Sequence, residues 1–315
     1  MERLRNVGFG KTGLEVTNIC IGAAPIGGMP YGGHRVSEIE AIQTLLHVFE
    51  SPIRFLDTAS IYEESELRIG KAIRAFGGLP ENFVIATKAD RDPQTGDFSA
   101  DQVKRSVDKS LEILGIDKLP IVYLHDPEHS SFTFEEITAE GGPVEELKKL
   151  KTEGLIGHIG ISGGPIDMMI DYVNTGEFEA VITHNRYTLL SRLAEPLIER
   201  ASQLGLAVVN AAVYNGGILA KGAESFPYYV YQEITKEVVN IIKRLEGICK
   251  EFNVSLPAVA LQFSLRNQKI ASTVVGMSSP EEIYQNLTLA EIEIPEGLWI
   301  ELARIPTVTT DPETK

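Results

Sequence analysis

Short apolar runs recur along the chain, and most are followed by a stretch in which apolar and polar residues alternate with a helical period. The runs occupy residues 18–23, 53–58, 82–88, 120–125, 157–162, 180–185, 206–212 and 272–278. Unbroken runs of about four to six apolar residues are typical of strands that are buried on both faces, as in a parallel sheet. The pattern therefore predicts eight parallel strands.

Amphipathic helices are predicted between these strands. The clearest helical patterns cover residues 38–50, 65–73, 100–115, 143–154, 194–205 and 237–252. Eight strand–helix units in a chain of about 300 residues favour a closed (β/α)8 TIM barrel over an open doubly wound sheet. An open sheet that binds a dinucleotide would carry G-x-G-x-x-G directly after a strand, and no such turn occurs in that context.

The two ends of the chain depart from this regular pattern. Residues 1–17 have the pattern of a short β-hairpin outside the barrel, with its turn at Lys11, Thr12 and Gly13, and residues 307–315 form a polar tail. No segment of linker-like composition interrupts the chain between them. We therefore expect a single barrel domain over residues 1–315.

Composition and charge narrow the class of partner. The net charge of −15, from 44 acidic and 29 basic residues, argues against nucleic acid, because phosphate binding needs clustered Lys and Arg. No apolar run approaches the roughly 18 residues of a membrane helix. The start of the chain has no apolar signal region, and Cys20 and Cys249 are the only cysteines, which fits a reducing cytoplasm. A small molecule is the expected partner, and the sequence does not indicate an oligomeric state.

Polar residues stand at the ends of three consecutive predicted strands. Asp57 ends the second strand, Lys88 ends the third and His125 ends the fourth, and Tyr62 follows on the loop after Asp57. The carboxyl ends of barrel strands meet at one mouth, where catalytic groups of this fold project. We therefore expect these four side chains to lie close together.

These four residue types fit a proton-transfer device. A tyrosine hydroxyl has a reference pKa of about 10. A lysine cation favours the phenolate, so Lys88 should lower the pKa of Tyr62, while Asp57 pairs with the lysine. His125 can hydrogen-bond a substrate oxygen. Such a device suits moving a proton on oxygen while a hydride moves at the attached carbon, and the hydride carrier must be a cofactor.

The chain resembles the aldo-keto reductase family along nearly its whole length. The matching stretches are FLDTASIYEESELRIGKAI, VIATK, LHDPE, GLIGHIGIS and VVGMSSPEEIYQN. The resemblance implies a catalytic tetrad of Asp57, Tyr62, Lys88 and His125. Within the family the chain is most similar to the branch of aldose, L-galactose and L-fucose 1-dehydrogenases. That branch implies oxidation of the anomeric carbon of an aldose to a lactone, with hydride passing to a nicotinamide.

The resemblance also implies where the cofactor lies. Ser162 and Asn185, at the ends of the fifth and sixth strands, would hold the nicotinamide carboxamide, although Gly163 stands where the family has an asparagine. Asn215, Gly216 and Gly217 would let backbone N–H groups approach the phosphates, or would simply form a turn.

The segment GMSSPEEIYQN carries the expectation about cofactor type. Ser279, Pro280 and Glu282 form a capping box that starts a helix. Where NADP-preferring relatives carry Arg or Lys, this chain has uncharged residues and Glu281 and Glu282. Two carboxylates would repel a 2′-phosphate by about 1 kcal/mol, so NAD is expected to bind better than NADP. The expected cofactor-binding residues of this segment are Gly276, Met277, Ser278, Glu282 and Asn286, of which Ser278 and Asn286 would hydrogen-bond the adenosine.

The sequence indicates the type of reaction more clearly than the identity of the substrate. Tyr31 and His34, in the loop after the first strand, and Asp126, beside His125, are candidates for substrate contacts, and no metal-binding spacing occurs. The same tetrad would serve a pyridoxal 4-dehydrogenase or an aldehyde or ketone reductase. A non-catalytic subunit that senses redox state through bound cofactor is the alternative from another class.

Overall fold

Eight parallel strands close into a barrel in the computed structural model of this chain, which describes residues 4–28, 35–230 and 232–313. Around the barrel the strands follow the chain order from β3 to β9, and β12 pairs with both β9 and β3. The barrel strands are β3 (Ile19–Gly22), β4 (Phe55–Asp57), β5 (Val84–Ala89), β6 (Leu119–His125), β7 (Ile156–Ser162), β8 (Ala180–His184), β9 (Ala207–Ala211) and β12 (Ser272–Gly276). The predicted (β/α)8 TIM barrel is confirmed.

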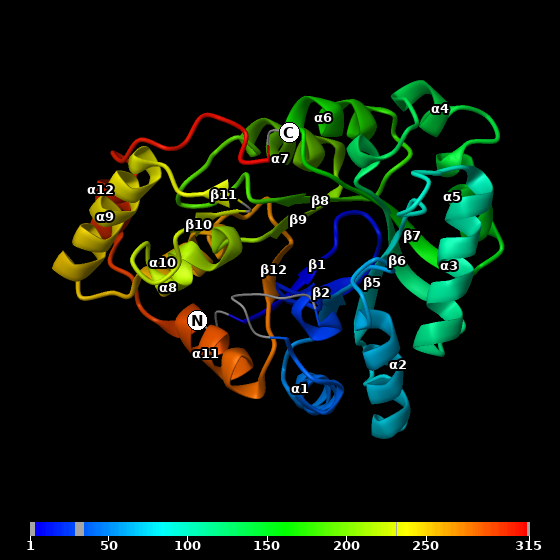
Figure 1. Cartoon of the computed structure of the whole chain (residues 1–315), viewed down its shortest axis with the longest axis horizontal. Helices are drawn as coiled ribbons and strands as arrows, with labels where there is room; N and C mark the ends of the chain where they lie inside the picture. Colours follow the sequence, from blue (N-terminus) through cyan, green and yellow to red (C-terminus); the bar gives the residue numbers. More distant parts are fainter. Residues whose placement is uncertain (1–3, 29–34, 231, 314–315) are drawn as a thin grey trace.

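Helices surround the barrel strands (Figure 1). They are α1 (Glu38–Glu50), α2 (Ser65–Phe76), α3 (Ala100–Leu114), α4 (Phe134–Thr138), α5 (Pro143–Thr152), α6 (Ile166–Asn174), α7 (Glu195–Leu204), α8 (Ile218–Lys221), α9 (Lys236–Glu251), α10 (Leu256–Leu265), α11 (Pro280–Glu291) and α12 (Glu296–Leu302). Three 3-10 turns interrupt the loops at η1 (Pro25–Gly27), η2 (Pro127–His129) and η3 (Asn215–Gly217). Most apolar helix faces and the outward residues of the strands form one large core, while α8, α9, α12 and part of α10 pack in a second cluster.

An antiparallel hairpin packs its apolar residues into the interior of the barrel. Its strands are β1 (Asn6–Gly8) and β2 (Glu15–Thr17), which confirms the predicted N-terminal hairpin. The ring of Phe9 meets the ring of Phe55 edge-on, with centroids 5.6 Å apart, and Val16 joins the same buried cluster. A second small sheet pairs β10 (Tyr228–Tyr229) with β11 (Gln232–Glu233).

The alternation of side chains along the strands determines which residues face the barrel interior. In β6, Ile121 and Tyr123 belong to the cluster inside the barrel, whereas Val122 and Leu124 pack outward against the helices. Successive side chains of a strand point to opposite faces. His125 therefore shares the inward face, and the same parity from the inward Phe55 turns Asp57 inward at the carboxyl end of β4.

The interior has no spare volume beside Tyr123. Its neighbour across the β6–β7 pair is Gly160, and a Cβ added there would lie 2.3 Å from the Tyr123 ring. Because the ring is fully buried, it has no free space to move into. A glycine at position 160 is thus required by the close packing of the barrel interior.

We expect Gly160→Ala to lower the free energy of unfolding by about 1–3 kcal/mol, the usual cost of overpacking a core. Urea unfolding followed by circular dichroism measures this change. The control is Gly247→Ala in α9, where an added Cβ meets no atom within 4 Å, and it should be neutral or stabilise by about 0.5–1 kcal/mol. Equal midpoints for both variants would contradict the packing argument.

Candidate active site

The ammonium of Lys88 and the carboxylate of Asp57 form a buried ion pair at the barrel mouth. Lys88 Nζ donates to Asp57 Oδ1 and to the Thr58 carbonyl, each at 2.6 Å. Burial lowers the pKa of Lys88, but the neighbouring Asp57 and Tyr62 more than offset this effect, so its pKa is raised and the side chain stays protonated. Burial raises the pKa of Asp57 against the opposing effect of Lys88. One permanent cation is therefore fixed at the mouth.

Tyr62 lies against both Lys88 and His125. The ammonium is 4.6 Å from the centroid of the Tyr62 ring, and the Tyr62 and His125 rings meet edge-on at 5.9 Å. Burial raises the pKa of Tyr62, and the carboxylates of Asp57 and Asp126 add to this, which together outweighs the lowering by Lys88. The prediction that Lys88 brings this pKa below its usual value is wrong, because the attraction of the lysine does not compensate the desolvation of a phenolate.

The loop that carries Tyr62 is held by the turn after β3. The Tyr62 amide donates to the Ala59 carbonyl at 3.1 Å, and the Glu64 amide donates to the Gly27 carbonyl at 3.2 Å. A Cβ added at Gly27 would lie 2.0 Å from the Tyr62 carbonyl oxygen. The position of Tyr62 therefore depends on the close approach of two backbone segments.

His125 forms a buried pair with a residue that sequence reasoning missed. Its Nδ1 bonds Oδ1 of Asp90, whose Oδ2 accepts from the Ser60 hydroxyl at 2.7 Å. Burial raises the pKa of Asp90, but the contacts with His125 and Ser60 hold it below its usual range. Because an ionised carboxylate can only accept, Nδ1 carries the proton. Nε2 is left 3.5 Å from Asp126 Oδ2.

A signal for Asp90 was present in the sequence. It follows Lys88 by two residues, and residues two apart on a strand share a face. Parity alone would therefore have placed Asp90 beside Lys88 at the mouth.

The candidate nicotinamide residues Ser162 and Asn185 follow neighbouring strands, β7 and β8, and both are buried. Asn185 Nδ2 donates to Glu313 Oε1 at 2.7 Å, while Asn185 Oδ1 is buried without a partner. At Gly163, a Cβ would lie 2.8 Å from Met169 Sδ and 3.0 Å from a Glu128 oxygen. The asparagine that the family resemblance implies at this position would require the ends of the Met169 and Glu128 side chains to shift.

In the candidate phosphate-binding turn, two of the three backbone amides already donate hydrogen bonds within the turn itself. Asn215 and Gly217 donate their amides to the carbonyls of Ala212 and Tyr214, at 2.8 and 3.0 Å. The side chain of Asn215 donates to the Asn185 carbonyl at 3.2 Å. Of the three predicted amide donors, only that of Gly216 makes no hydrogen bond among the described residues, so it is the one that could bind an anion.

The segment before and within α11 is tied together by its own side chains. Ser278 donates its amide and hydroxyl to Glu282 Oε2 at 2.6 and 2.8 Å, and Ser279 accepts from the Glu282 amide at 3.3 Å. The predicted capping box is therefore only half formed at Ser279, because the Glu282 carboxylate reaches one residue further back.

Two other residues of this segment are also occupied. Asn286 accepts from the Tyr214 hydroxyl at 2.8 Å, and its Nδ2 donates to the Glu282 carbonyl at 2.8 Å. The side chain of Met277 is fully buried in the core, so only its main chain is available to a ligand. Gly276 ends β12 and is exposed.

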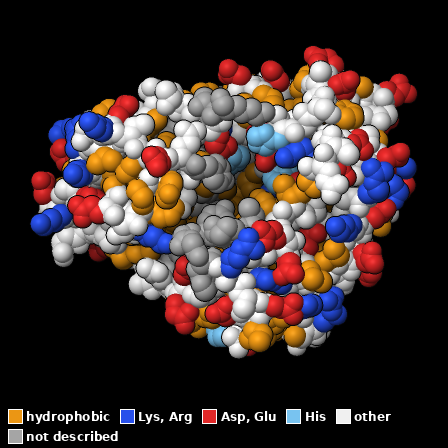
Figure 2. Space-filling model, viewed as in Figure 1, with side chains coloured by type: hydrophobic (Ala, Val, Ile, Leu, Met, Phe, Trp, Pro, Cys, Tyr) orange, Lys and Arg blue, Asp and Glu red, His pale blue; other side chains and the backbone are white. Residues whose placement is uncertain are grey.

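Only one candidate substrate residue can be placed. Tyr31 and His34 lie outside the described residues. Asp126 has a side chain that is 20% exposed, and its Oδ1 is buried without a partner. Figure 2 shows a hollow near the middle of the molecule, with histidine and hydrophobic side chains around it.

The C-terminal tail reaches residues near this mouth, which the sequence did not predict. Glu313 contacts His184 and Asn185, and Asp311 pairs with the buried Arg186. These contacts join residues more than 120 positions apart in the chain. No local pattern could have indicated them.

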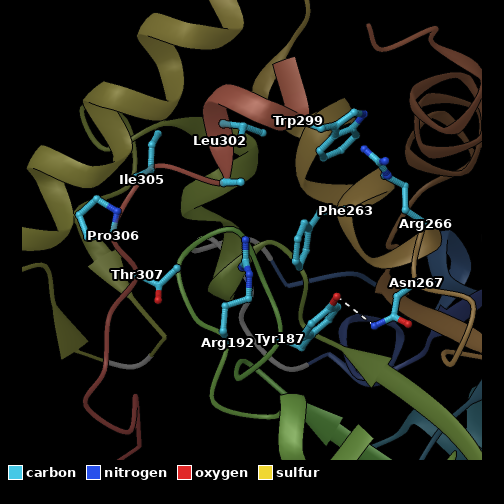
Figure 3. A pocket seen from close by; sticks show the side chains of 11 residues that line it. Tyr187, Arg192, Phe263, Arg266, Asn267, Trp299, Leu302, Ile305, Pro306 and Thr307 are labelled. Carbon is cyan, nitrogen blue, oxygen red and sulfur yellow. Dashed lines mark hydrogen bonds between the residues drawn. The ribbon is translucent and has the colours of Figure 1, made fainter. Parts of the chain in front are cut away.

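A separate cavity of about 600 Å³ lies outside the barrel, among α10, α12 and the loop after β8 (Figure 3). Arg192 stacks on Phe263 at 3.8 Å and Arg266 stacks on Trp299 at 4.3 Å, each measured to the ring centroid. None of the four predicted catalytic residues lines it. The cavity is therefore distinct from the candidate active site.

Two features are absent from the part of the chain that the structure describes. Within residues 4–28, 35–230 and 232–313, no three His, Cys, Asp or Glu residues are grouped so that they could hold a metal ion. No helix in these ranges is both long and apolar enough to span a membrane.

Comparison with known proteins identifies similar chains. The model described as "Aldo/keto reductase family" matches residues 18–305. The chain is 30% identical to D-threo-aldose 1-dehydrogenase of a Pseudomonas species, over 95% of this chain and 96% of that protein. It is also 30% identical to pyridoxal 4-dehydrogenase of Microbacterium luteolum, over 93% of this chain and 95% of that protein. A solved aldo-keto reductase from Bacillus halodurans, in its holo form, superposes with a TM-score of 0.79 at 22% identity, covering 98% of this chain and 100% of that one.

We expect Asp57→Asn to lower the free energy of unfolding by about 3–5 kcal/mol, because it leaves the buried Lys88 ammonium unpaired. Adding Lys88→Met should restore part of the loss. The matched control is Asp108→Asn, which breaks an exposed pair with Lys104 of the same 2.6 Å length and should cost at most about 1 kcal/mol. Urea unfolding measures all three variants, and a similar cost for the buried and exposed pairs would contradict this account.

Proposed function

The chain belongs to the aldo/keto reductase family, and we propose that it oxidises the C1 hydroxyl of an aldose to a lactone, with NAD as the hydride acceptor. The observation that carries the proposal is that the buried Asp57, Lys88 and His125 and the half-buried Tyr62 converge on one mouth of the barrel. The aldose 1-dehydrogenase at 30% identity supports the sugar substrate.

The residues present fit a nicotinamide cofactor. Asn185 offers a buried oxygen without a partner, and Ser162 ends the neighbouring strand. When bound, the cofactor supplies the carbon that accepts a hydride, which no side chain provides.

In the proposed reaction, Tyr62 takes the proton of the C1 hydroxyl. The Lys88 ammonium, 4.6 Å from the ring, stabilises the phenolate, and Asp57 keeps the lysine in place. His125, oriented through Nδ1 by Asp90, directs Nε2 to the oxygens of the substrate. The raised pKa of Tyr62 means that phenolate is scarce at neutral pH, so oxidation should accelerate as the pH rises.

Asp126 supports a substrate rich in hydroxyl groups. Its Oδ1 is buried without a partner and lies on the residue next to His125. A buried acceptor without a donor costs about 1–3 kcal/mol, and a sugar hydroxyl would remove that cost.

The raised pKa of Tyr62 also favours a second candidate function. A tyrosine that holds its proton at neutral pH is suited to donate it, which is the role required for reducing an aldehyde or ketone. The two candidates differ in direction and in pH dependence, since reduction uses the protonated form and oxidation uses the phenolate.

NAD is proposed over NADP because acidic side chains at the start of α11 would repel the 2′-phosphate that only NADP carries. Glu281 lies exposed in the first turn of α11, and its pKa is held below the usual range by hydrogen bonds at the helix start. Its neighbour Glu282 is fixed on Ser278. A 2′-phosphate at this helix start would meet the carboxylates of Glu281 and Glu282.

We expect Tyr62→Phe to reduce turnover by about a hundredfold to ten-thousandfold, the usual contribution of a general acid or base, and to leave NAD binding nearly unchanged. In the unchanged protein, kcat/KM for oxidation should rise by up to about tenfold per pH unit above neutrality. The control is Tyr284→Phe, since Tyr284 is 65% exposed. Retention of most activity in Tyr62→Phe would exclude the proposed mechanism.

The experiment that tests the proposed function follows reduced cofactor when the protein meets NAD or NADP with L-fucose, L-galactose, D-arabinose, L-glucose or pyridoxal. We expect turnover of a sugar, faster with NAD, and a ratio of NAD to NADP activity that falls at least about fivefold in Glu281→Arg.

Each other outcome of this panel overturns part of the proposal. Activity with pyridoxal alone would exclude the sugar. Cofactor binding without any oxidation would exclude a dehydrogenase and leave a reductase or a redox-sensing subunit. An assay of aldehyde reduction with NADH distinguishes these two, because only the reductase would turn over.

A further inference from the structure

The C-terminal tail is anchored to the loop after β8. The Val308 amide donates to the Leu190 carbonyl at 2.7 Å, and Val308 bridges Ser191. In Figure 1 the tail runs from α12 across the rim of the molecule to the C-terminus near α6 and α7. The tail therefore lies over one side of the barrel rather than extending away from it.

A buried arginine fixes the end of the tail. Arg186 is 1% exposed, and its Nε and Nη2 donate to the two carboxylate oxygens of Asp311 at 2.8 and 2.7 Å. Bidentate pairs of this kind constrain geometry as well as charge. The following turn carries Glu313 to the carboxyl end of β8.

Glu313 joins two consecutive residues there. Its Oε1 accepts from Asn185 Nδ2 at 2.7 Å and its Oε2 meets His184 Nε2 at 2.9 Å. Burial raises the pKa of Glu313, but the stronger opposing effects of His184, Arg186 and Asn185 bring it down to about 2. Glu313 raises the pKa of His184 against the effect of burial. The carboxylate is therefore ionised at neutral pH.

An ionised carboxylate decides which end of the Asn185 amide faces it. Such a group has no proton to donate, so it must face the NH₂ end. Oδ1 is then held on the opposite side of the planar amide, where it is buried and without a partner. A nicotinamide carboxamide carries an NH₂ group that could satisfy this oxygen.

We infer that Glu313 is a positioning residue for the cofactor: it fixes the Asn185 amide so that its free carbonyl oxygen accepts from the NH₂ of the nicotinamide carboxamide. This inference rests on the proposed function. Because Gly163 stands where the family resemblance implies an asparagine, no second amide lies beside Ser162, and the orientation of Asn185 carries more of the recognition. Without Glu313 the Asn185 amide can rotate by half a turn, so that its own NH₂ group faces the NH₂ group of the nicotinamide carboxamide.

The test is titration calorimetry, without substrate, of NAD and of its 3-acetylpyridine analogue, in which a methyl ketone replaces the carboxamide. The unchanged protein should bind NAD about tenfold more tightly than the analogue, the value of one good hydrogen bond. In Glu313→Ala this preference should fall to about one, with the affinity for the analogue unchanged. Glu313→Gln should be intermediate, since a glutamine can accept from Asn185 or donate to it.

Glu301→Ala, which removes an acid of α12 that pairs with Arg304 and whose side chain is 42% exposed, is the matched control and should retain the full preference. An equal loss for both nucleotides in Glu313→Ala would show that the tail merely covers the cofactor and would overturn the inference. Tighter NAD binding in that variant would overturn it too, because the tail would then be a competitor. Failure of the folded, unchanged protein to bind either nucleotide would instead overturn the proposed function.

Discussion

The ammonium of Lys88 is enclosed within the barrel, and compensating its charge determines how the mouth is built. Removing an ion from water costs several kcal/mol even after the protein relaxes. The compensation comes from Asp57 on the adjacent strand, from the Thr58 carbonyl and from the face of the Tyr62 ring. Tyr62 is thereby held in a field where one cation opposes two carboxylates, and burial decides the balance.

The same principle of local neutralisation recurs around the rim. His125 lies between Asp90 and Asp126, and Glu313 lies between His184 and Asn185, with Arg186 nearby. Each ionisable side chain is oriented by a neighbour of opposite charge or by a hydrogen bond. Several buried polar atoms have no partner, and among them Asp126 Oδ1 and Asn185 Oδ1 are acceptors that a hydroxyl and an amide would satisfy.

Strand-based reasoning predicted the barrel and the convergence of Asp57, Lys88 and His125, because unbroken apolar runs and strand ends are local features of the sequence. It missed helix α10, which is buried on most of its surface and therefore shows no clear amphipathic period. It missed Asp311 and Glu313 because their partners are distant in the chain. It gave the wrong direction for the pKa of Tyr62 because desolvation depends on how much of the fold encloses the ring.

The hairpin of β1 and β2 has a kinetic consequence. Its Phe9 and Val16 are fully buried in the cluster that fills the barrel interior, so that end offers no passage. Any molecule that reaches Lys88 must arrive and depart through the opposite opening. On the proposed function, cofactor and substrate would share that opening, so the one that lies deeper would have to bind first and dissociate last. The hairpin, by closing the other end of the barrel, would thereby impose an order on binding.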